Sequence, residues 1–188
     1  MKARLTKLRF KKMRLVFFGS SNDSSEVLNK LLNDGFNVEL VVTQGSKASG
    51  RGLRITVTPV EKVAKAKNVE VTNGDTLLKK EYRKKLIERK PDLFIVVAYG
   101  KILPKAIIKI PRLGTINVHP SILPFFRGPS PVATAILEGA GSTGVTLMLL
   151  DEGMDTGPII KKSDSIILRG DEKCSELSRK LFEIGGNL

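Results

Sequence analysis

Cysteine and histidine are almost missing from this chain of 188 residues, which contains one of each, Cys174 and His119. A single cysteine cannot form a disulfide bond within the chain, which indicates a reducing compartment and a cytoplasmic protein. With one histidine and one cysteine, almost only carboxylates would remain as metal ligands. We therefore expect chemistry without a metal ion.

Long apolar runs and nucleotide-binding fingerprints are also missing. No stretch approaches the roughly 18 consecutive apolar residues of a membrane-spanning helix, so no membrane partner is expected. The turn at residues 19–23 contains one glycine, whereas a dinucleotide fingerprint needs glycine at further positions. No phosphate-binding loop of the Gly-x-x-x-x-Gly-Lys type occurs. These absences argue against an NAD enzyme and against a nucleotide hydrolase.

Basic residues are in clear excess, with 32 Lys and Arg against 19 Asp and Glu, a formal net charge of +13. Such an excess attracts polyanions, with a strong dependence on salt. Nucleic acid is therefore the leading class of partner, although a lysine-rich proteome would give the same composition. The basic stretch 79–90 has the pattern of an amphipathic helix, and we interpret its charges as a solvent-facing surface.

Short apolar runs alternate with segments of helical periodicity. The run 13–18 and the very apolar run 93–98 are typical of buried parallel strands. Asp75 and Asp171 stand where they could cap helices. The alternation predicts an α/β fold with an open, mostly parallel Rossmann-like sheet and helices on both faces.

The densest polar cluster, residues 117–128, begins on a strand predicted at 115–118. Asn117 and His119 are two residues apart, so they lie on one face of that strand if it continues far enough. An amide and an imidazole on one atom could stabilise an oxyanion and handle a proton. A histidine satisfied within a turn is an equally good interpretation of the residue types alone.

A second polar cluster, residues 151–157, also follows a predicted strand and combines acidic residues with glycines. Glycine allows the backbone of such a loop to approach a ligand closely. A carboxylate from this loop could orient the imidazole of His119 or order a water molecule. Alone, an acidic and glycine-rich loop is usually a turn; next to the histidine cluster it favours a site.

Asn117-x-His119, the segment 121–124 and the loop 151–157 together resemble the signature of the folate-dependent formyltransferases. The resemblance covers residues 13–188 and implies the formyltransferase fold, with Asn117, His119 and Asp155 as the catalytic set. It also implies 10-formyltetrahydrofolate as the formyl donor and no metal. The residues implied in donor binding are Ala98, Tyr99, Gly100, Ile102, Leu103, Ser121, Ile122, Leu123, Pro124 and Asp151.

The loop from Thr43 to Gly52, with Pro59 and Val60 beyond it, is similar to that of the branch of the family that formylates methionyl initiator tRNA. In that branch the loop contacts the acceptor arm, which implies tRNA contacts by Lys47, Arg51 and Arg54. Lysine and arginine make most phosphate contacts. The loop departs from the family pattern around Lys47, and the turn after Gly19 lacks the usual threonine and aromatic residue.

Alternatives to this function remain open at the level of sequence. They are a formyltransferase for a small amine such as glycinamide ribonucleotide or an amino sugar, a folate hydrolase, and a tRNA-binding module without turnover. We expect residues 1–12 to be a basic extension, or an organellar presequence, before a catalytic domain at 13–188. We further expect the C-terminal β-barrel domain of the family to be absent and the chain to be a monomer.

Overall fold

A computed structural model describes residues 12–45, 47–49, 54–75 and 79–188. The strands are β1 (Leu15–Gly19), β2 (Val38–Thr43), β3 (Lys47–Ser49), β4 (Arg54–Thr56), β5 (Glu70–Asn73), β6 (Leu93–Val97), β7 (Thr115–His119), β8 (Ser142–Thr143), β9 (Thr146–Leu149), β10 (Ile159–Lys162) and β11 (Ile166–Ile167). The helices are α2 (Asn22–Asn33), α3 (Pro59–Ala66), α4 (Lys80–Glu88), α5 (Lys105–Ile108), α6 (Pro131–Leu137) and α7 (Cys174–Asn187).

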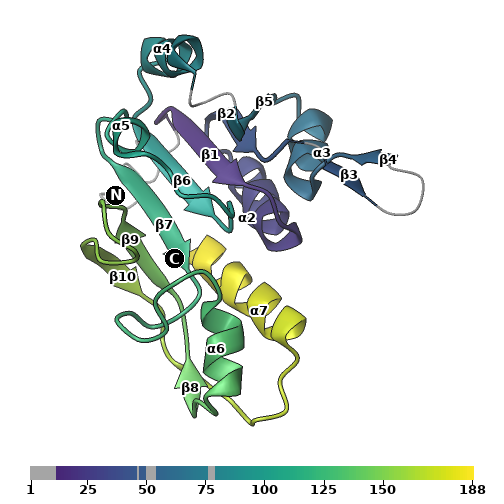
Figure 1. The fold of residues 1–188 in the computed structure, drawn as a ribbon, viewed down its shortest axis with the longest axis vertical. Coiled ribbons are helices and arrows are strands. Elements are labelled where there is room, and N and C mark those ends of the chain that lie inside the picture. Colours follow the sequence, from purple (N-terminus) through teal and green to yellow (C-terminus); the bar gives the residue numbers. More distant parts are fainter. Residues whose placement is uncertain (1–11, 46, 50–53, 76–78) are drawn as a thin grey trace, which may run out of the picture.

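A seven-stranded sheet in the order β10-β9-β7-β6-β1-β2-β5 forms the centre of the molecule (Figure 1). Strands β7, β6, β1, β2 and β5 are parallel to one another, whereas β9 and β10 are antiparallel to their neighbours. The predicted open, mostly parallel sheet is confirmed. The antiparallel end of the sheet determines how the site described below is assembled.

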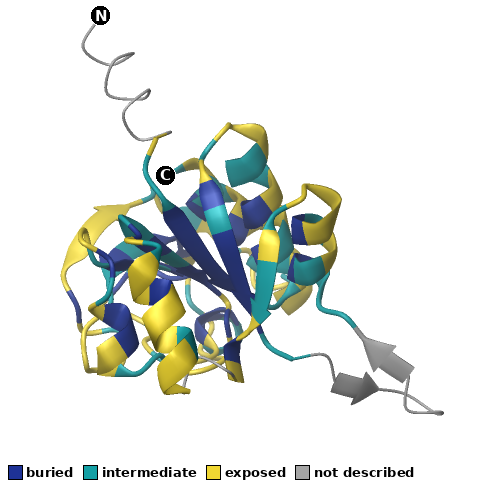
Figure 2. Cartoon of the chain, turned by 90° about the horizontal axis from the view of Figure 1, so that it is seen from above, coloured by how far each residue is buried: buried dark blue, intermediate teal, exposed yellow. Residues whose placement is uncertain are grey.

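The alternation of side chains along β1 divides the core into two layers. Leu15 and Phe17 point into a cluster that contains buried residues of α2, α3, α6 and α7. Val16 and Phe18 point into a second cluster with buried residues of α4 and α5. Successive residues of a strand face opposite sides of its sheet, so the predicted helices on both faces are confirmed. Figure 2 shows the buried strands between these two layers.

Capping side chains determine where two of the helices begin. At α2, the Ser21 hydroxyl accepts a hydrogen bond from the Ser24 amide, and the Ser24 side chain accepts one from the Ser21 amide. Thr58 caps α3 in the same way through the Glu61 amide, and Pro59 occupies the first turn. Each cap satisfies amides that have no partner within the helix. The start of α2 is thereby fixed next to the carboxyl end of β1.

Two predicted helix starts are wrong. Asp75 lies before α4, whose N-cap is Lys79, and the Asp75 carboxylate forms an ion pair with Lys101. Helix α7 starts after Lys173 rather than after Asp171. The Glu172 carboxylate accepts hydrogen bonds from the amides of residues 169 and 170, at 2.5 and 2.9 Å. It therefore closes a turn where the sequence suggested a cap.

Two small antiparallel pairs lie outside the main sheet, β3 with β4 and β11 with β8. The sequence pattern did not predict β3 and β4, which extend beyond α3 at one side of the molecule (Figure 1). Among the described residues, no helix is long and apolar enough to cross a membrane.

Candidate active site

A cleft of about 990 Å³ opens beside the carboxyl ends of β6 and β7. Its lining comes from the segment after β6, the end of β7, the loop after β9 and the first turns of α2, α6 and α7. Open α/β sheets bind ligands at this edge. The predicted site residues that line the cleft are Asn117, His119, Asp155, Ala98, Tyr99, Gly100, Ile102, Leu103 and Asp151.

His119 is the last residue of β7, and its side chain is 3% exposed. Its Nε2 lies 3.1 Å from the carbonyl oxygen of Phe126. Because a carbonyl only accepts hydrogen bonds, Nε2 carries the proton in this contact. The other nitrogen, Nδ1, lies 3.7 Å from Oδ1 of Asp155. The imidazole is therefore oriented by a backbone group, and Nδ1 is on the side of the carboxylate.

Asp155 reaches His119 by a route that the sequence did not indicate. Strand β9 is antiparallel to β7, so its last residues pair near the beginning of β7, with Leu149 opposite Ile116. The loop that follows must therefore return along β7 to bring Asp155 to His119. There, Oδ2 of Asp155 accepts a hydrogen bond of 2.8 Å from the Gly128 amide. This bond holds the carboxylate with its other oxygen toward the imidazole.

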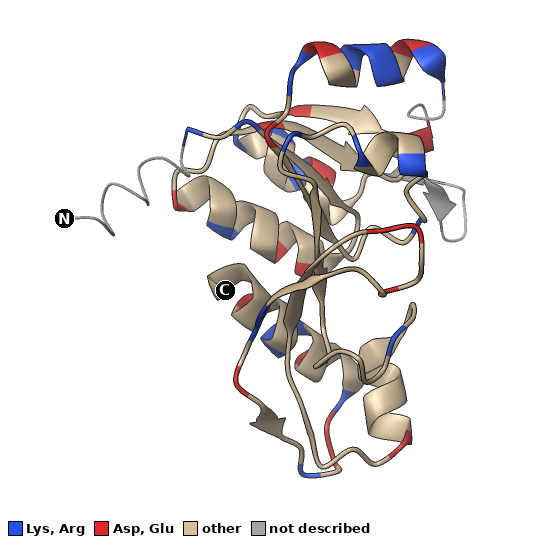
Figure 3. Cartoon of the chain, turned by 90° about the vertical axis from the view of Figure 1, so that its left-hand side faces the viewer, with Lys and Arg blue, Asp and Glu red and all other residues tan. Residues whose placement is uncertain are grey.

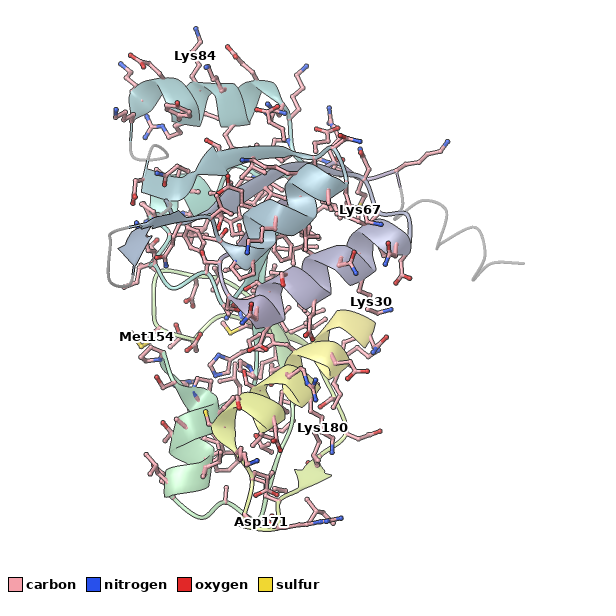
Figure 4. All side chains as sticks on the ribbon, turned by 90° about the vertical axis from the view of Figure 1, so that its right-hand side faces the viewer. Lys30, Lys67, Lys84, Met154, Asp171 and Lys180 are labelled. Atoms are coloured by element: carbon pink, nitrogen blue, oxygen red, sulfur yellow. The ribbon has the colours of Figure 1, made fainter. Side chains whose placement is uncertain are left out.

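Glycines and Asp151 shape the returning loop. Asp151 Oδ1 accepts hydrogen bonds from the Gly153 amide at 3.0 Å and from the Thr156 hydroxyl at 2.8 Å. A Cβ on Gly157 would lie 1.9 Å from the carbonyl oxygen of Leu149, so only glycine fits there. Asp151 thus has a structural part in the loop in addition to its place in the cleft lining. The flanking Met154 is 58% exposed and is labelled in Figure 4.

Asn117 provides the amide of the site. It lies on β7 two residues before His119, lines the cleft, and is half-buried. Among the described residues, its side chain has no hydrogen-bond partner. An amide donor in this state is available to a ligand without breaking an existing hydrogen bond. Asn117, His119 and Asp155 thus all line the cleft, and Asn117 and His119 do so from the same strand.

The segment 98–100 forms the wall of the cleft after β6. Ala98 and Gly100 adopt left-handed backbone conformations, with φ of +39° and +77°. Burial raises the pKa of Tyr99 to about 12, and the nearby Asp75 carboxylate adds to this effect. A Cβ on Gly74 would lie 1.7 Å from the Tyr99 hydroxyl oxygen, so glycine makes room for that group. Ile102, 88% exposed, offers an apolar surface at the mouth of the cleft.

Residues 121–124 lie outside the cleft lining, in contrast to their predicted contact with the donor. Ser121 and Leu123 are buried. The Ser121 hydroxyl donates to the Phe125 carbonyl at 2.6 Å. The Leu123 amide donates to the Thr146 hydroxyl at 3.0 Å, which in turn donates to the Ser121 carbonyl at 2.7 Å. This segment supports the turn that carries the Phe126 carbonyl, so the geometry favours an indirect role.

Sequence reasoning missed three groups that hold the site: the Phe126 carbonyl, the Gly128 amide and the Thr146 hydroxyl. Phe126 has a positive φ of +55°, a strained conformation for a bulky residue. The first two contacts use backbone atoms, which residue identity does not reveal. Thr146 could have been suspected, because a buried hydroxyl needs a hydrogen-bond partner.

The predicted tRNA-binding residues belong to the segment that follows β2. The backbones of Lys47 and Arg54 lie in β3 and β4, which are paired antiparallel, and Arg51 lies outside the described residues. Helix α4 is also rich in basic residues (Figure 3). Its Lys84, labelled in Figure 4, forms an exposed ion pair with Glu88 at 3.9 Å. This agrees with the solvent-facing interpretation of α4.

Carboxylates, histidine and cysteine do not gather elsewhere in the described ranges: no group of three or more could hold a metal ion there. The formyl transferase family profile matches residues 13–188. The chain belongs to the formyl transferase family.

Curated relatives give a more particular comparison. The chain is 42% identical over 176 residues to a methionyl-tRNA formyltransferase of Chloroflexus aggregans, covering 94% of this chain and 57% of that protein. It is 43% identical over 176 residues to a methionyl-tRNA formyltransferase of Wolbachia pipientis, covering 94% and 58%. The chain thus spans less than two thirds of the length of these relatives.

A solved structure supports the fold. The phosphoribosylglycinamide formyltransferase of Bacillus halodurans superposes with a TM-score of 0.75, covering 93% of this chain and 90% of that chain. Its sequence identity is 24%. This likeness confirms the formyltransferase fold predicted from the sequence.

Proposed function

We propose that this chain transfers a formyl group from 10-formyltetrahydrofolate to the α-amino group of methionyl initiator tRNA. The single observation that carries the chemistry is that Asn117 and His119 line the cleft from the same strand, with the Asp155 carboxylate 3.7 Å from Nδ1 of His119. The acceptor is supported by the identity of 42–43% to two methionyl-tRNA formyltransferases. The basic β3–β4 segment and the net charge of +13 add to that support.

The reaction needs an electrophile, a nucleophile and a route for one proton. The amine nitrogen attacks the formyl carbon, and the carbonyl electron pair moves to oxygen. The Asn117 amide donates a hydrogen bond to this oxyanion, together with the imidazole of His119 in its protonated form. The carbon–nitrogen bond to the folate then breaks, and its electron pair remains on the folate nitrogen. The amine loses one proton and the folate nitrogen gains one.

Asp155 supports both roles of His119. The Asp155 carboxylate lies 3.7 Å from Nδ1, where it would stabilise the positive charge that develops while the imidazole carries the transferred proton. A protonated Nδ1 can hydrogen-bond to the oxyanion or return its proton to the leaving nitrogen. Burial of both side chains, 3% and 11% exposed, limits screening by water.

The cleft fits a folate donor in its chemistry. The wall after β6 is apolar at Val96, Leu103 and Ile108, and the opposite loop contributes Leu150. Apolar walls with a few convergent polar groups are typical of small-molecule sites, which enclose about 300–1,000 Å³.

The decisive experiment is formyl transfer from 10-formyltetrahydrofolate to methionyl-tRNA, with the unaltered chain and with His119→Ala and Asn117→Ala. We expect transfer by the unaltered chain and loss of roughly 100-fold or more in each variant. Two variants are used because His119 is buried and its replacement can disturb packing.

Transfer to glycinamide ribonucleotide instead of tRNA would show that the proposed acceptor is wrong. Folate breakdown without any acceptor would identify a hydrolase, and no turnover would leave only a binding module.

A further inference from the structure

Gln44, the one glutamine of the sequence, connects three loops at the edge of the cleft. It follows β2 directly and precedes the basic strand β3. Its side-chain Nε2 donates a hydrogen bond of 2.8 Å to the carbonyl oxygen of Tyr99. Its backbone amide donates to the Ser20 hydroxyl at 3.1 Å, and Ser20 donates to the same Tyr99 carbonyl at 3.3 Å. One carbonyl thus joins the loops after β1, β2 and β6.

The Tyr99 carbonyl belongs to a strained turn. Ala98 before it and Gly100 after it both have positive φ, +39° and +77°. A non-glycine residue in the left-handed region costs on the order of 1–3 kcal/mol, and such a turn persists only where its surroundings hold it. The Ser24 hydroxyl donates a hydrogen bond of 2.6 Å to the Val97 carbonyl, just before the turn. The Gln44 side chain donates to the Tyr99 carbonyl, within the turn.

The fit between Gln44 and the turn is also steric. A Cβ on Gly100 would lie 2.6 Å from Nε2 of Gln44. The glutamine amide therefore rests against the bare backbone of Gly100 while it donates to the preceding carbonyl. Ala98, Tyr99 and Gly100 line the cleft, whereas Gln44 does not.

We infer that Gln44 is a positioning residue that fixes the turn 98–100 for the formyl donor. It does so from the base of the segment that carries the basic strands β3 and β4. The inference rests on the proposed function for the identity of the donor. Gln44 acts through Tyr99 and Gly100, at a distance from Asn117 and His119. Its loss should therefore weaken donor binding and leave the transfer step largely intact.

Substitutions that keep the size of Gln44 test this inference. Gln44→Met removes the donor, and Gln44→Glu places a carboxylate against the Tyr99 carbonyl. We expect the KM for 10-formyltetrahydrofolate to rise roughly 2- to 12-fold in Gln44→Met, as for the removal of one hydrogen bond. The rise should be larger in Gln44→Glu, with kcat changing less than KM in both. An unchanged donor KM in both variants would indicate that Gln44 only fills space and would overturn the inference.

Asn37→Leu is the matched control. Asn37 lies just before β2, at the opposite end of that strand, and its exposed amide donates to Glu39 at 3.2 Å. The substitution removes a side-chain amide far from the cleft. We expect it to leave the donor KM unchanged.

A double-mutant cycle with Gly100→Ala tests the mechanism. In the unaltered chain, the new methyl group must displace the Gln44 amide and also strain the turn. In Gln44→Ala the space is free and only the strain remains. We therefore expect Gly100→Ala to raise the donor KM less in the Gln44→Ala background. Additive effects would show that the two residues act independently and would overturn the inference.

A measurement without ligand separates this inference from the proposed function. Formyl transfer by the unaltered chain tests the function alone. Hydrogen exchange of the amides at 99–101 tests the positioning in the free protein. Exchange at these amides should be faster in Gln44→Met than in the unaltered chain, and unchanged in Asn37→Leu. Unchanged exchange in Gln44→Met would overturn the positioning role even if formyl transfer is observed.

Discussion

The carboxylate of Asp155 lies 3.7 Å from Nδ1 of His119, close enough for strong attraction but longer than a hydrogen bond. The two residues are on separate segments, one at the end of β7 and the other in a loop that returns along it. The Gly128 amide fixes the carboxylate and the Phe126 carbonyl fixes the imidazole. A small movement of the Asp155 carboxylate toward Nδ1 would bring the two atoms within hydrogen-bond distance. The site is thus oriented before a substrate arrives.

Asp155→Asn should separate the charge of this residue from its hydrogen bond. Asparagine can still accept the bond from Gly128, but it carries no charge to stabilise the proton on the imidazole during transfer. Because general acid–base groups contribute about 10²–10⁴-fold, we expect kcat to fall roughly 100-fold with little change in KM. Asp155→Ala should lower kcat further, since it also leaves the Gly128 amide without its hydrogen-bond acceptor. Steady-state kinetics with a kcat near that of the unaltered chain in Asp155→Asn would contradict the electrostatic role.

Asn117→Ala should act on the transition state alone. Loss of one donor to a developing oxyanion costs about 10²–10³ in kcat in other enzymes. The Asn117 side chain has no hydrogen-bond partner in the described part of the chain, so its removal should cost little stability. Ile116→Val, on the alternate face of β7, is the control and should keep both stability and kcat. A thermal unfolding midpoint that drops with kcat would point to a structural role for Asn117.

Binding of tRNA should depend on the basic strands β3 and β4 rather than on α4. Removing one protein–phosphate ion pair reduces the slope of log affinity against log salt by roughly 0.7–0.9. Lys47→Gln combined with Arg54→Gln should therefore weaken binding and flatten the salt dependence. Lys84→Gln on α4 also removes a positive charge, but Lys84 already forms an ion pair with Glu88. This substitution should change neither the affinity for tRNA nor its salt dependence. Filter-binding titrations at several salt concentrations would measure the affinity and its salt dependence. Equal effects of the β3–β4 variant and of Lys84→Gln would indicate non-specific attraction.

Much of the fold follows from the sequence because buried parallel strands and capped helices leave local patterns. The apolar run of β6 and the polar residues that end β7 placed the cleft correctly. The route of the loop 151–157 cannot be predicted from the sequence, because the direction of β9 is set by its pairing with β7 in the sheet. The support by Phe126 and Gly128 is made through backbone atoms. The position of residues 121–124 behind the site depends on the same tertiary contacts.

Gly157 should be intolerant of any side chain. A Cβ there would lie 1.9 Å from the Leu149 carbonyl oxygen, a backbone atom that cannot move alone. Overpacking typically costs about 1–3 kcal/mol, so Gly157→Ala should lower the free energy of unfolding by that amount and displace Asp155. Gly141→Ala is the matched control, because a Cβ at Gly141 meets nothing within 4 Å. Similar urea midpoints for the two variants would show that the loop relaxes freely.

Acid sensitivity of the fold should depend in part on Asp92, at the end of the sheet away from the cleft. The Arg14 amide donates to its carboxylate at 2.8 Å, and Arg112 lies 3.3 Å from it. These contacts lower the pKa of Asp92 below the usual 3.8, the Arg14 hydrogen bond being the largest cause.

A carboxylate whose folded pKa is lowered stabilises the protein above the unfolded pKa and ceases to do so as pH falls through the folded value. The stability difference between the unaltered chain and Asp92→Asn should therefore be constant near neutrality. It should shrink below about pH 4, where the unfolded carboxyl takes up its proton first. Urea unfolding of both proteins across this range would measure it. A difference that stays constant into acid would show that the negative charge of Asp92 contributes nothing to stability.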